Sequence, residues 1–92
     1  MPITFEWDER KNRQNIEKHG ISFRRAATIF NGSVLQWEDN RKDYGEERRI
    51  AIGRMANRIL QVVYTLRNRN IRIISARKAT KDERRKYLLV YH

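Results

Sequence analysis

The sequence predicts an α+β fold, in which an antiparallel β-sheet meander is flanked by an N-terminal helical pair and a C-terminal helix. Three observations predict it. Two segments with helical periodicity open the chain, four β-type segments joined by short turns follow them, and a capping box precedes a last helical segment. Consecutive strands with short connections pair in antiparallel order, and helices then pack on the sheet.

A short strand and a polar helix are expected first. Residues 3–7 alternate in polarity around Phe5, which is typical of a strand. Asp8 then supplies an N-cap for a helix over residues 9–19, and Gly20 ends that helix in the usual C-terminal manner. At helical spacing, one face of this helix carries Asn12, Ile16 and His19.

The second helix begins after Ser22, which is another N-cap residue, and stops at Asn31-Gly32. Its expected buried stripe, spaced at i, i+3, i+4 and i+7, consists of Phe23, Ala26, Ala27 and Phe30. Because the connection between the two helices is very short, we expect a tight helical hairpin or elbow.

Four strands are expected next, over residues 34–38, 48–54, 59–66 and 71–76. Their connections are a charged loop at residues 39–45 and polar turns at 55–58 and 67–70. Leu35 and Trp37 share one face of the first strand, and Ile50 and Ile52 share one face of the second. The third strand is apolar on both faces, as central strands are.

The end of the chain is expected to hold the last strand and a helix. Strict alternation in that strand places Ile71, Ile73, Ser75 and Arg77 on one face and Arg72, Ile74 and Ala76 on the other. Thr80 and Glu83 match a capping box, so a helix is expected from about residue 81. One face of this helix carries Arg84, Tyr87, Leu88 and Tyr91.

The composition favours a small basic protein with an anionic partner. The 92 residues suffice for one domain, over residues 1–92, with a modest core. The 21 Lys and Arg outnumber the 11 Asp and Glu and give a formal charge of +10, which attracts polyanions such as nucleic acid. The first seven residues do not match a signal peptide, and no apolar run reaches the ~20 residues of a membrane span, so we expect a cytoplasmic protein.

Several kinds of reactive site are excluded by residue types and spacing. The chain has no cysteine, which excludes disulfides, thiolate metal sites and cysteine nucleophiles. Neither His19 nor His92 has a carboxylate at a metal-ligand spacing, and no glycine precedes a Lys-Ser or Lys-Thr pair. The serines lack the nearby base and strained turn of a nucleophile. We therefore expect no metal and no cofactor.

Arginines on and beside the predicted strands are the main candidates for chemistry. They are Arg48, Arg49, Arg54, Arg67, Arg69, Arg72 and Arg77. A guanidinium can grip a phosphate through two parallel hydrogen bonds, which suits metal-free RNA cleavage by an attacking 2′-hydroxyl. Glu47, His19 and Tyr87 are candidates for proton transfer, and Tyr44 is the aromatic residue best placed to stack on a base.

Several segments together resemble the BrnT toxin family, in order and at the family's spacing over nearly the whole chain. The most specific are Lys-His-Gly-Ile-Ser-Phe at residues 18–23 and Arg-Ile-Ile-Ser-Ala-Arg at residues 72–77. Weaker matches lie at residues 5–8, 15–17, 26–30, 46–48, 52–53, 63–67, 78–80 and 83–87. The chain departs from the pattern after the second helix, where many relatives have Asp-Pro and this sequence has Asn31-Gly32-Ser33.

The resemblance implies a RelE-like fold and an RNA-cleaving toxin that arrests translation. It also implies a BrnA-like antitoxin with a DNA-binding region, which neutralises the toxin in a hetero-oligomer and represses their shared operon, so that the toxin meets operator DNA only indirectly. Catalysis is carried over first to Arg67 and Arg77, and then to Glu47, Arg48, Lys18 and His19. The residues expected to bind RNA are Arg69, Arg72 and Tyr44.

Two functions of other classes fit the same composition. A small basic protein that binds nucleic acid without cleaving it would explain the charge equally well, although no helix-turn-helix with a basic recognition helix stands out. A structural or ribosome-associated protein would show no toxicity when the chain is expressed alone. Cleavage of RNA by the purified chain separates both from the ribonuclease.

Overall fold

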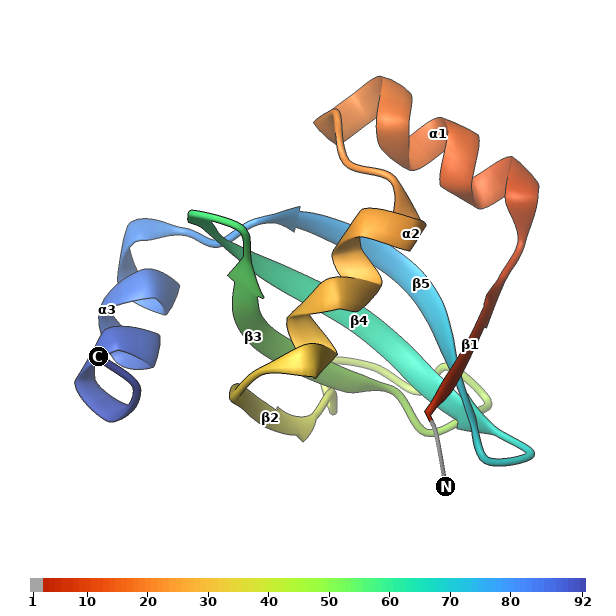
Figure 1. Cartoon of the computed structure of the whole chain (residues 1–92). Helices are drawn as coiled ribbons and strands as arrows, with labels where there is room; N and C mark the ends of the chain where they lie inside the picture. The colour runs from red at the N-terminus through yellow and green to blue at the C-terminus, as the bar shows by residue number, and fades with distance from the viewer. Residues whose placement is uncertain (1–2) are drawn as a thin grey trace.

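The computed structural model describes residues 3–92, in which helices pack on a five-stranded sheet of order β1-β5-β4-β3-β2 (Figure 1). The elements are β1 (Thr4–Trp7), α1 (Glu9–His19), α2 (Phe23–Ala26), the 3₁₀ helix η1 (Ala27–Asn31), β2 (Val34–Glu38), β3 (Arg49–Met55), β4 (Arg58–Arg67), β5 (Asn70–Lys78) and α3 (Lys81–Val90). This order confirms the predicted α+β class. Met1 and Pro2, which belong to the segment compared with signal peptides, lie outside the described residues.

Strands β2 to β5 form the predicted antiparallel meander. The β4–β5 turn is tight because Asn68 and Arg69 both have positive φ, of 51° and 71°, as the two central residues of a type I′ turn require. The sequence did not predict where β1 lies. It pairs in parallel with β5, where Thr4 lies opposite Asn70 and Trp7 lies opposite Ile73, so the sheet is mixed at this edge.

The second helix differs from its prediction in pitch. Ser22 caps it as expected, but only one α-helical turn forms before the chain tightens into η1. A 3₁₀ helix has three residues per turn, so its inward positions repeat at i, i+3 and i+6. Ile29 is therefore fully buried beside Phe23 and Ala26, whereas Phe30, at the predicted i+7 position, is half-buried.

The predicted face of α1 was partly wrong. Asp8 and the left-handed Gly20 end the helix as expected, but Ile16 is 43% exposed and the buried residues are Asn12 and Asn15. The reason is that this helix packs against main chain. The amide of Asn12 accepts a hydrogen bond from the Phe23 N–H at 2.8 Å, so the face that packs is polar.

Asn15 pairs with the edge of β5 as a neighbouring strand would. Its side-chain oxygen accepts from the Ala76 N–H at 3.1 Å, and its side-chain nitrogen donates to the Ala76 carbonyl at 2.9 Å and to the Ile21 carbonyl at 2.8 Å. Strand β1 pairs with β5 only as far as Ile73. Asn15 therefore satisfies main-chain groups that β1 leaves unpaired, which a buried strand edge requires.

A β-bulge in β5 overturns the predicted alternation. Val63 lies opposite Ser75 and Tyr64 lies opposite Ile73, so Ile74 is an extra residue without a partner on β4. One face of the sheet, here called the arginine face, consequently carries Arg72, Ser75 and Arg77 opposite Thr65, Val63 and Gln61. The other face, called the helix face, carries Ile71, Ile73 and Ala76.

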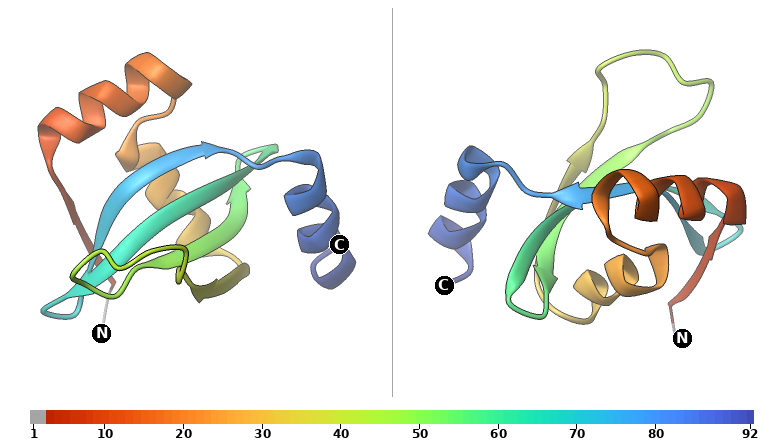
Figure 2. Two further views of the ribbon diagram at one scale, coloured as in Figure 1. Left: turned by 180° about the vertical axis from the view of Figure 1, so that it is seen from behind. Right: turned by 90° about the horizontal axis from the view of Figure 1, so that it is seen from above.

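Two apolar clusters lie on the two faces of the sheet. The larger one is on the helix face, where α2 and η1 cover the sheet, and the smaller one lies where α3 covers one end of the arginine face (Figure 2). In α3 the predicted capping box forms and Tyr87 is buried. Leu88, however, is 41% exposed, so its predicted place on the packed face of the helix was wrong.

Gly53 allows η1 to approach β3 closely. A Cβ atom at this position would lie 2.9 Å from the Ile29 Cβ and 2.9 Å from the Val34 Cγ1. Gly53→Ala should therefore overpack the core and lower the free energy of unfolding by about 1–3 kcal/mol, measured by urea denaturation. The control is Gly32→Ala, where a Cβ meets nothing within 4 Å and a change below about 0.5 kcal/mol is expected. Equal effects of the two substitutions would contradict the close approach.

The Asn15 contacts can be tested by removing its donor. Asn15→Asp replaces the amide nitrogen by an oxygen that faces two carbonyls, so we expect a loss of about 3 kcal/mol of stability in urea denaturation. Hydrogen exchange at the Ala76 N–H should also become faster. Gln14→Glu makes the same chemical change at the exposed neighbouring position and serves as the control. Unchanged exchange at Ala76 would show that Asn15 does not protect this edge.

Candidate active site

The part of the arginine face that α3 leaves uncovered has α1 along one side and the loop between β2 and β3 along another (Figure 2). A cleft of about 330 Å³ lies between α1 and the bulge of β5. The residues that line it are Lys11, Gln14, Asn15, Lys18, His19, Arg48, Ile74 and Ser75. Lys18, His19 and Arg48, three of the residues predicted to be catalytic, therefore come together from segments far apart in the sequence.

The last turn of α1 supplies Lys18 and His19. Gly20, at φ +71°, ends the helix with its N–H bonded to the Ile16 carbonyl, so both side chains lie at the C-terminal end of the helix. The free carbonyls there carry partial negative charge, which stabilises cationic side chains. His19 is half-buried in the cleft wall and Lys18 is exposed.

Arg48 is held by the loop before β3. Its guanidinium carbon lies 4.1 Å from the centre of the Tyr44 ring, and its Nε lies 3.5 Å from a Glu46 oxygen. The Tyr44 hydroxyl in turn donates to Asp39 at 3.2 Å. Tyr44, expected to be exposed for base stacking, is therefore half-buried and uses its ring to position Arg48.

Asp39 anchors this loop. Its carboxylate is buried and accepts two hydrogen bonds of 2.8 Å from the Arg41 guanidinium and one of 3.2 Å from the Arg41 N–H. The side-chain hydrogen bonds from Arg41 are the largest influence on Asp39 and outweigh its burial, lowering the pKa of Asp39 from 3.8 to about 2. The anchored loop fixes the position of Arg48 at the mouth of the cleft.

Two further residues of the sequence-predicted site, Arg72 and Glu47, form ion pairs with residues that do not line the cleft. Arg72 lies on the arginine face and donates to Glu6 at 2.8 Å, which joins β5 to β1. The Glu47 side chain is exposed and pairs with Arg49 at 3.4 Å, while its main-chain carbonyl accepts from Thr65 at 2.6 Å. Glu47 does not line the cleft.

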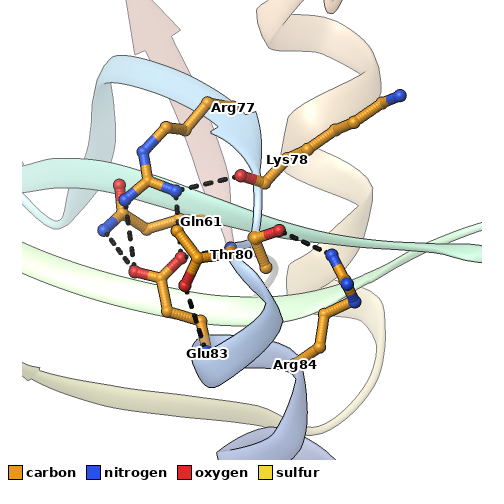
Figure 3. Close-up of polar contacts among 7 residues, drawn as sticks. Gln61, Arg77, Lys78, Thr80, Glu83 and Arg84 are labelled. Atoms are coloured by element: carbon orange, nitrogen blue, oxygen red, sulfur yellow. Dashed lines mark hydrogen bonds and ion pairs between the residues drawn. The ribbon is translucent and has the colours of Figure 1, made fainter.

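Arg77 is held by the first turn of α3 (Figure 3). Its guanidinium donates to both carboxylate oxygens of Glu83, at 2.9 and 3.2 Å, and to the Lys78 carbonyl at 2.9 Å, while Gln61 also donates to Glu83. Burial opposes the ionisation of Glu83, but hydrogen bonds from Arg77 and Thr80 outweigh it and hold the pKa of Glu83 below its ordinary value. Arg77 is therefore part of the contact that docks α3.

The structure does not bring Arg67 and Arg77 together. Both lie on the arginine face, but Arg67 is exposed at the β4–β5 turn beside Arg69, whereas Arg77 lies opposite Gln61. Gln61 and Arg67 are six positions apart on β4, which corresponds to about 20 Å of strand. One phosphate cannot contact both guanidinium groups in this arrangement.

Sequence reasoning missed the way in which the cleft is assembled. Lys11, Gln14 and Ser75 line it but were not selected, and Asn15 was not recognised as the residue that joins α1 to β5. An amide one turn before the helix end was the available signal, because its donor and acceptor can pair with main-chain groups. Within residues 3–92, no three His, Cys, Asp or Glu side chains lie together as a metal site requires.

Comparison with known proteins identifies the family. The model of BrnT, described as the ribonuclease toxin of a type II toxin–antitoxin system, matches residues 7–83. The chain belongs to the BrnT family. Its structure is similar to the crystal structure of the Brucella abortus ribonuclease toxin BrnT, with 26% sequence identity and a TM-score of 0.64, over 87% of this chain and 100% of that chain. A comparison with curated proteins found no match.

The family match confirms the ribonuclease toxin prediction and decides against the two non-catalytic alternatives. Membership of a type II system also implies an antitoxin protein and an RNA substrate as partners. The structural match supports the predicted fold. No helix within residues 3–92 is long and apolar enough to cross a membrane.

The anchoring of the loop by Asp39 predicts a pH dependence. In the unfolded chain Asp39 takes up a proton near 3.8, but in the folded chain only near 2. Its contribution to stability is therefore complete above pH 3.8 and is lost as the pH falls towards 2. Asp39→Asn should lower the free energy of unfolding at pH 5 by about 1 kcal/mol, a small value because Arg41 is 62% exposed to screening water.

Urea denaturation at several pH values checks this, with Asp43→Asn as a control that removes the same charge from the same loop. The difference between wild type and Asp39→Asn should shrink as the pH falls from 4 towards 2, across the interval between the two pKa values. A difference that is constant over this interval would mean that the Asp39 carboxylate does not stabilise the folded loop.

Proposed function

We propose that this toxin cleaves RNA in the cleft between α1 and β5 without a metal ion, and that it thereby arrests translation in the cytoplasm. The observation that carries the proposal is the meeting of Lys18, His19 and Arg48 in one cleft. In phosphodiester cleavage by an internal hydroxyl, cations can stabilise the charge on the phosphoryl oxygens and an imidazole can transfer a proton.

In the proposed reaction, the 2′-oxygen of one ribose bonds to the adjacent phosphorus while the bond from phosphorus to the 5′-oxygen of the next nucleotide breaks. The products are a 2′,3′-cyclic phosphate and a 5′-hydroxyl. A base takes the proton of the 2′-hydroxyl and an acid gives a proton to the leaving 5′-oxygen. Lys18 and Arg48 stabilise the negative charge that grows on the phosphoryl oxygens.

His19 is the preferred residue for proton transfer. Imidazole is the side chain that most readily exchanges protons near neutral pH, and His19 lines the cleft beside both cations. Of the other two sequence-predicted proton carriers, Glu47 pairs with Arg49 outside the cleft, and the buried Tyr87 donates its hydroxyl to the Ser33 carbonyl. His19 thus has the better position for either the base or the acid.

The RNA strand on either side of the cleft is proposed to follow the arginine face. Arg72 and Arg67 lie on this face, and Arg69 lies in the turn next to Arg67. These side chains can contact phosphates, so affinity for RNA should fall as salt rises. Arg77 contributes less directly, since it supports α3 through Glu83. Tyr44 contributes through its contact with Arg48.

The antitoxin is proposed to be a BrnA-like protein with a DNA-binding region, which forms a hetero-oligomer with the toxin. Operator DNA is then bound through the antitoxin alone. A toxin with a formal charge of +10 favours an antitoxin that is acidic where it covers the cleft, because complementary charge speeds association. Masking of the cations would prevent RNA from entering.

Cleavage of a mixed RNA by the purified chain in excess EDTA tests the site. Lys18→Ala and Arg48→Ala should each lower the rate about a hundredfold, because each removes one group that stabilises the transition-state charge. His19→Ala should lower it by a similar factor or more. Arg13→Ala is the matched control, because Arg13 is an exposed cation of α1 that does not line the cleft.

Three results would count against parts of the proposal. Loss of cleavage in EDTA, with recovery when Mg²⁺ is added, would overturn the metal-free reaction. A double Arg67→Ala/Arg77→Ala variant that loses cleavage, with full activity in Lys18→Ala and Arg48→Ala, would move the site away from the cleft. RNA binding without cleavage in vitro, together with cleavage in a cell-free translation extract, would make the reaction ribosome-dependent.

A further inference from the structure

The last turn of α3 exposes three apolar side chains. Leu88, Leu89 and Val90 are 41%, 73% and 55% exposed. Leu88 and Leu89 line a groove of about 380 Å³ together with Lys81, Arg84 and Arg85, so residues of α3 alone form it. These five residues are here called the α3 surface, and Val90 lies outside this groove. Contiguous exposed apolar side chains on a small protein commonly mark a place where another molecule binds.

The way α3 docks keeps this surface outward. The opposite side of the helix carries Tyr87, whose hydroxyl donates to the Ser33 carbonyl at 2.8 Å, and Tyr91 follows with a contact of 3.4 Å to the Val34 carbonyl. The first turn is fixed by the bidentate contact between Arg77 and Glu83. The leucines cannot turn inward without breaking these contacts at both ends of the helix.

The charge of the α3 surface limits what can bind there. Three cations, Lys81, Arg84 and Arg85, lie along the helix beside the leucines, and the groove has no acidic lining residue. A fitting partner therefore offers apolar side chains with carboxylates next to them. An amphipathic helix with an acidic border has this pattern, because i, i+3 and i+4 positions form one face.

A second copy of the chain fits poorly. In a two-fold symmetric pair the same patch faces itself, so the three cations of each copy would be buried in one interface without an acidic partner. The partner that the family provides is the antitoxin of the type II system. We propose that the α3 surface is a docking site for an acidic amphipathic segment of the antitoxin.

This site is separate from the cleft. No residue lines both, and α3 lies at the other end of the sheet from α1 in each view (Figures 1 and 2). One segment of the antitoxin can thus bind the toxin at α3 while another segment of the antitoxin covers the cations of the cleft. The inference rests on the family's antitoxin and not on the proposed cleft chemistry.

The α3 surface also lies largely outside the family match, which ends at residue 83. Four of its five residues, all except Lys81, follow this point. The proposed antitoxin contact therefore lies largely outside the part of the chain that the family model describes.

Affinity for the full-length antitoxin encoded beside the toxin tests the proposal, measured by isothermal titration calorimetry. A Leu88→Ser/Leu89→Ser variant and an Arg85→Glu variant should each bind about tenfold more weakly or worse. The apolar control is Leu66→Ser, since Leu66 is 59% exposed on β4, and the charge control is Arg25→Glu on α2. Both controls should bind within about twofold of the wild type.

RNA cleavage by the free variants provides the second measurement and should equal that of the wild type, which also shows that they fold. Unchanged antitoxin affinity in both α3 variants would overturn the proposal. Loss of RNA cleavage in these variants would also overturn it, because the α3 surface would then bind RNA.

Two further measurements test the other possible occupants: binding to phosphatidylserine vesicles tests a membrane, and light scattering tests a second copy of the chain. Vesicle binding or a dimer that the α3 substitutions abolish, with unchanged antitoxin affinity, would assign the surface to a membrane or to a second copy. A wild type that binds its antitoxin through α3 but cleaves RNA neither in vitro nor in a cell-free translation extract would refute the proposed cleft chemistry and leave this inference intact.

Discussion

The pairing of the Asn15 amide with both main-chain groups of Ala76 is the interaction on which the candidate site depends. It replaces a strand neighbour where β1 stops pairing, and it fixes α1 along the edge of β5. Because Lys18 and His19 follow Asn15 by one turn of the same helix, their place relative to the sheet is set by this one side chain. A single amide therefore joins the edge of the sheet to the wall of the cleft.

The bulge at Ile74 completes this arrangement from the side of the sheet. One extra residue turns Ser75 and Arg77 to the face that carries Arg72, and keeps Ala76 on the face that the helices cover. In a regular strand Ser75 would face the apolar core and the cleft would lack its floor. Bulges often re-aim side chains beside active sites.

Local signals in the sequence predicted most of the helices and strands. The features that the sequence did not predict arise from pairing between distant segments. Asp8, Gly20 and the Thr80–Glu83 box act within a few residues, so their effects can be foreseen from spacing. The parallel place of β1 and the bulge of β5 depend on contacts between distant segments, which periodicity does not encode. For the same reason Lys18, His19 and Arg48 could be selected singly, but their meeting in one cleft could not be predicted.

The parallel pairing of β1 with β5 has a consequence for synthesis. Thr4 meets Asn70, so the first strand of the chain waits for the last strand before it can enter the sheet. Contacts between residues so far apart in sequence form late in folding. A nascent chain that lacks β5 has neither the strand edge that receives Asn15 nor the floor of the cleft. The candidate site is thus completed only after β5 has been translated, so a shorter nascent chain cannot assemble the cleft.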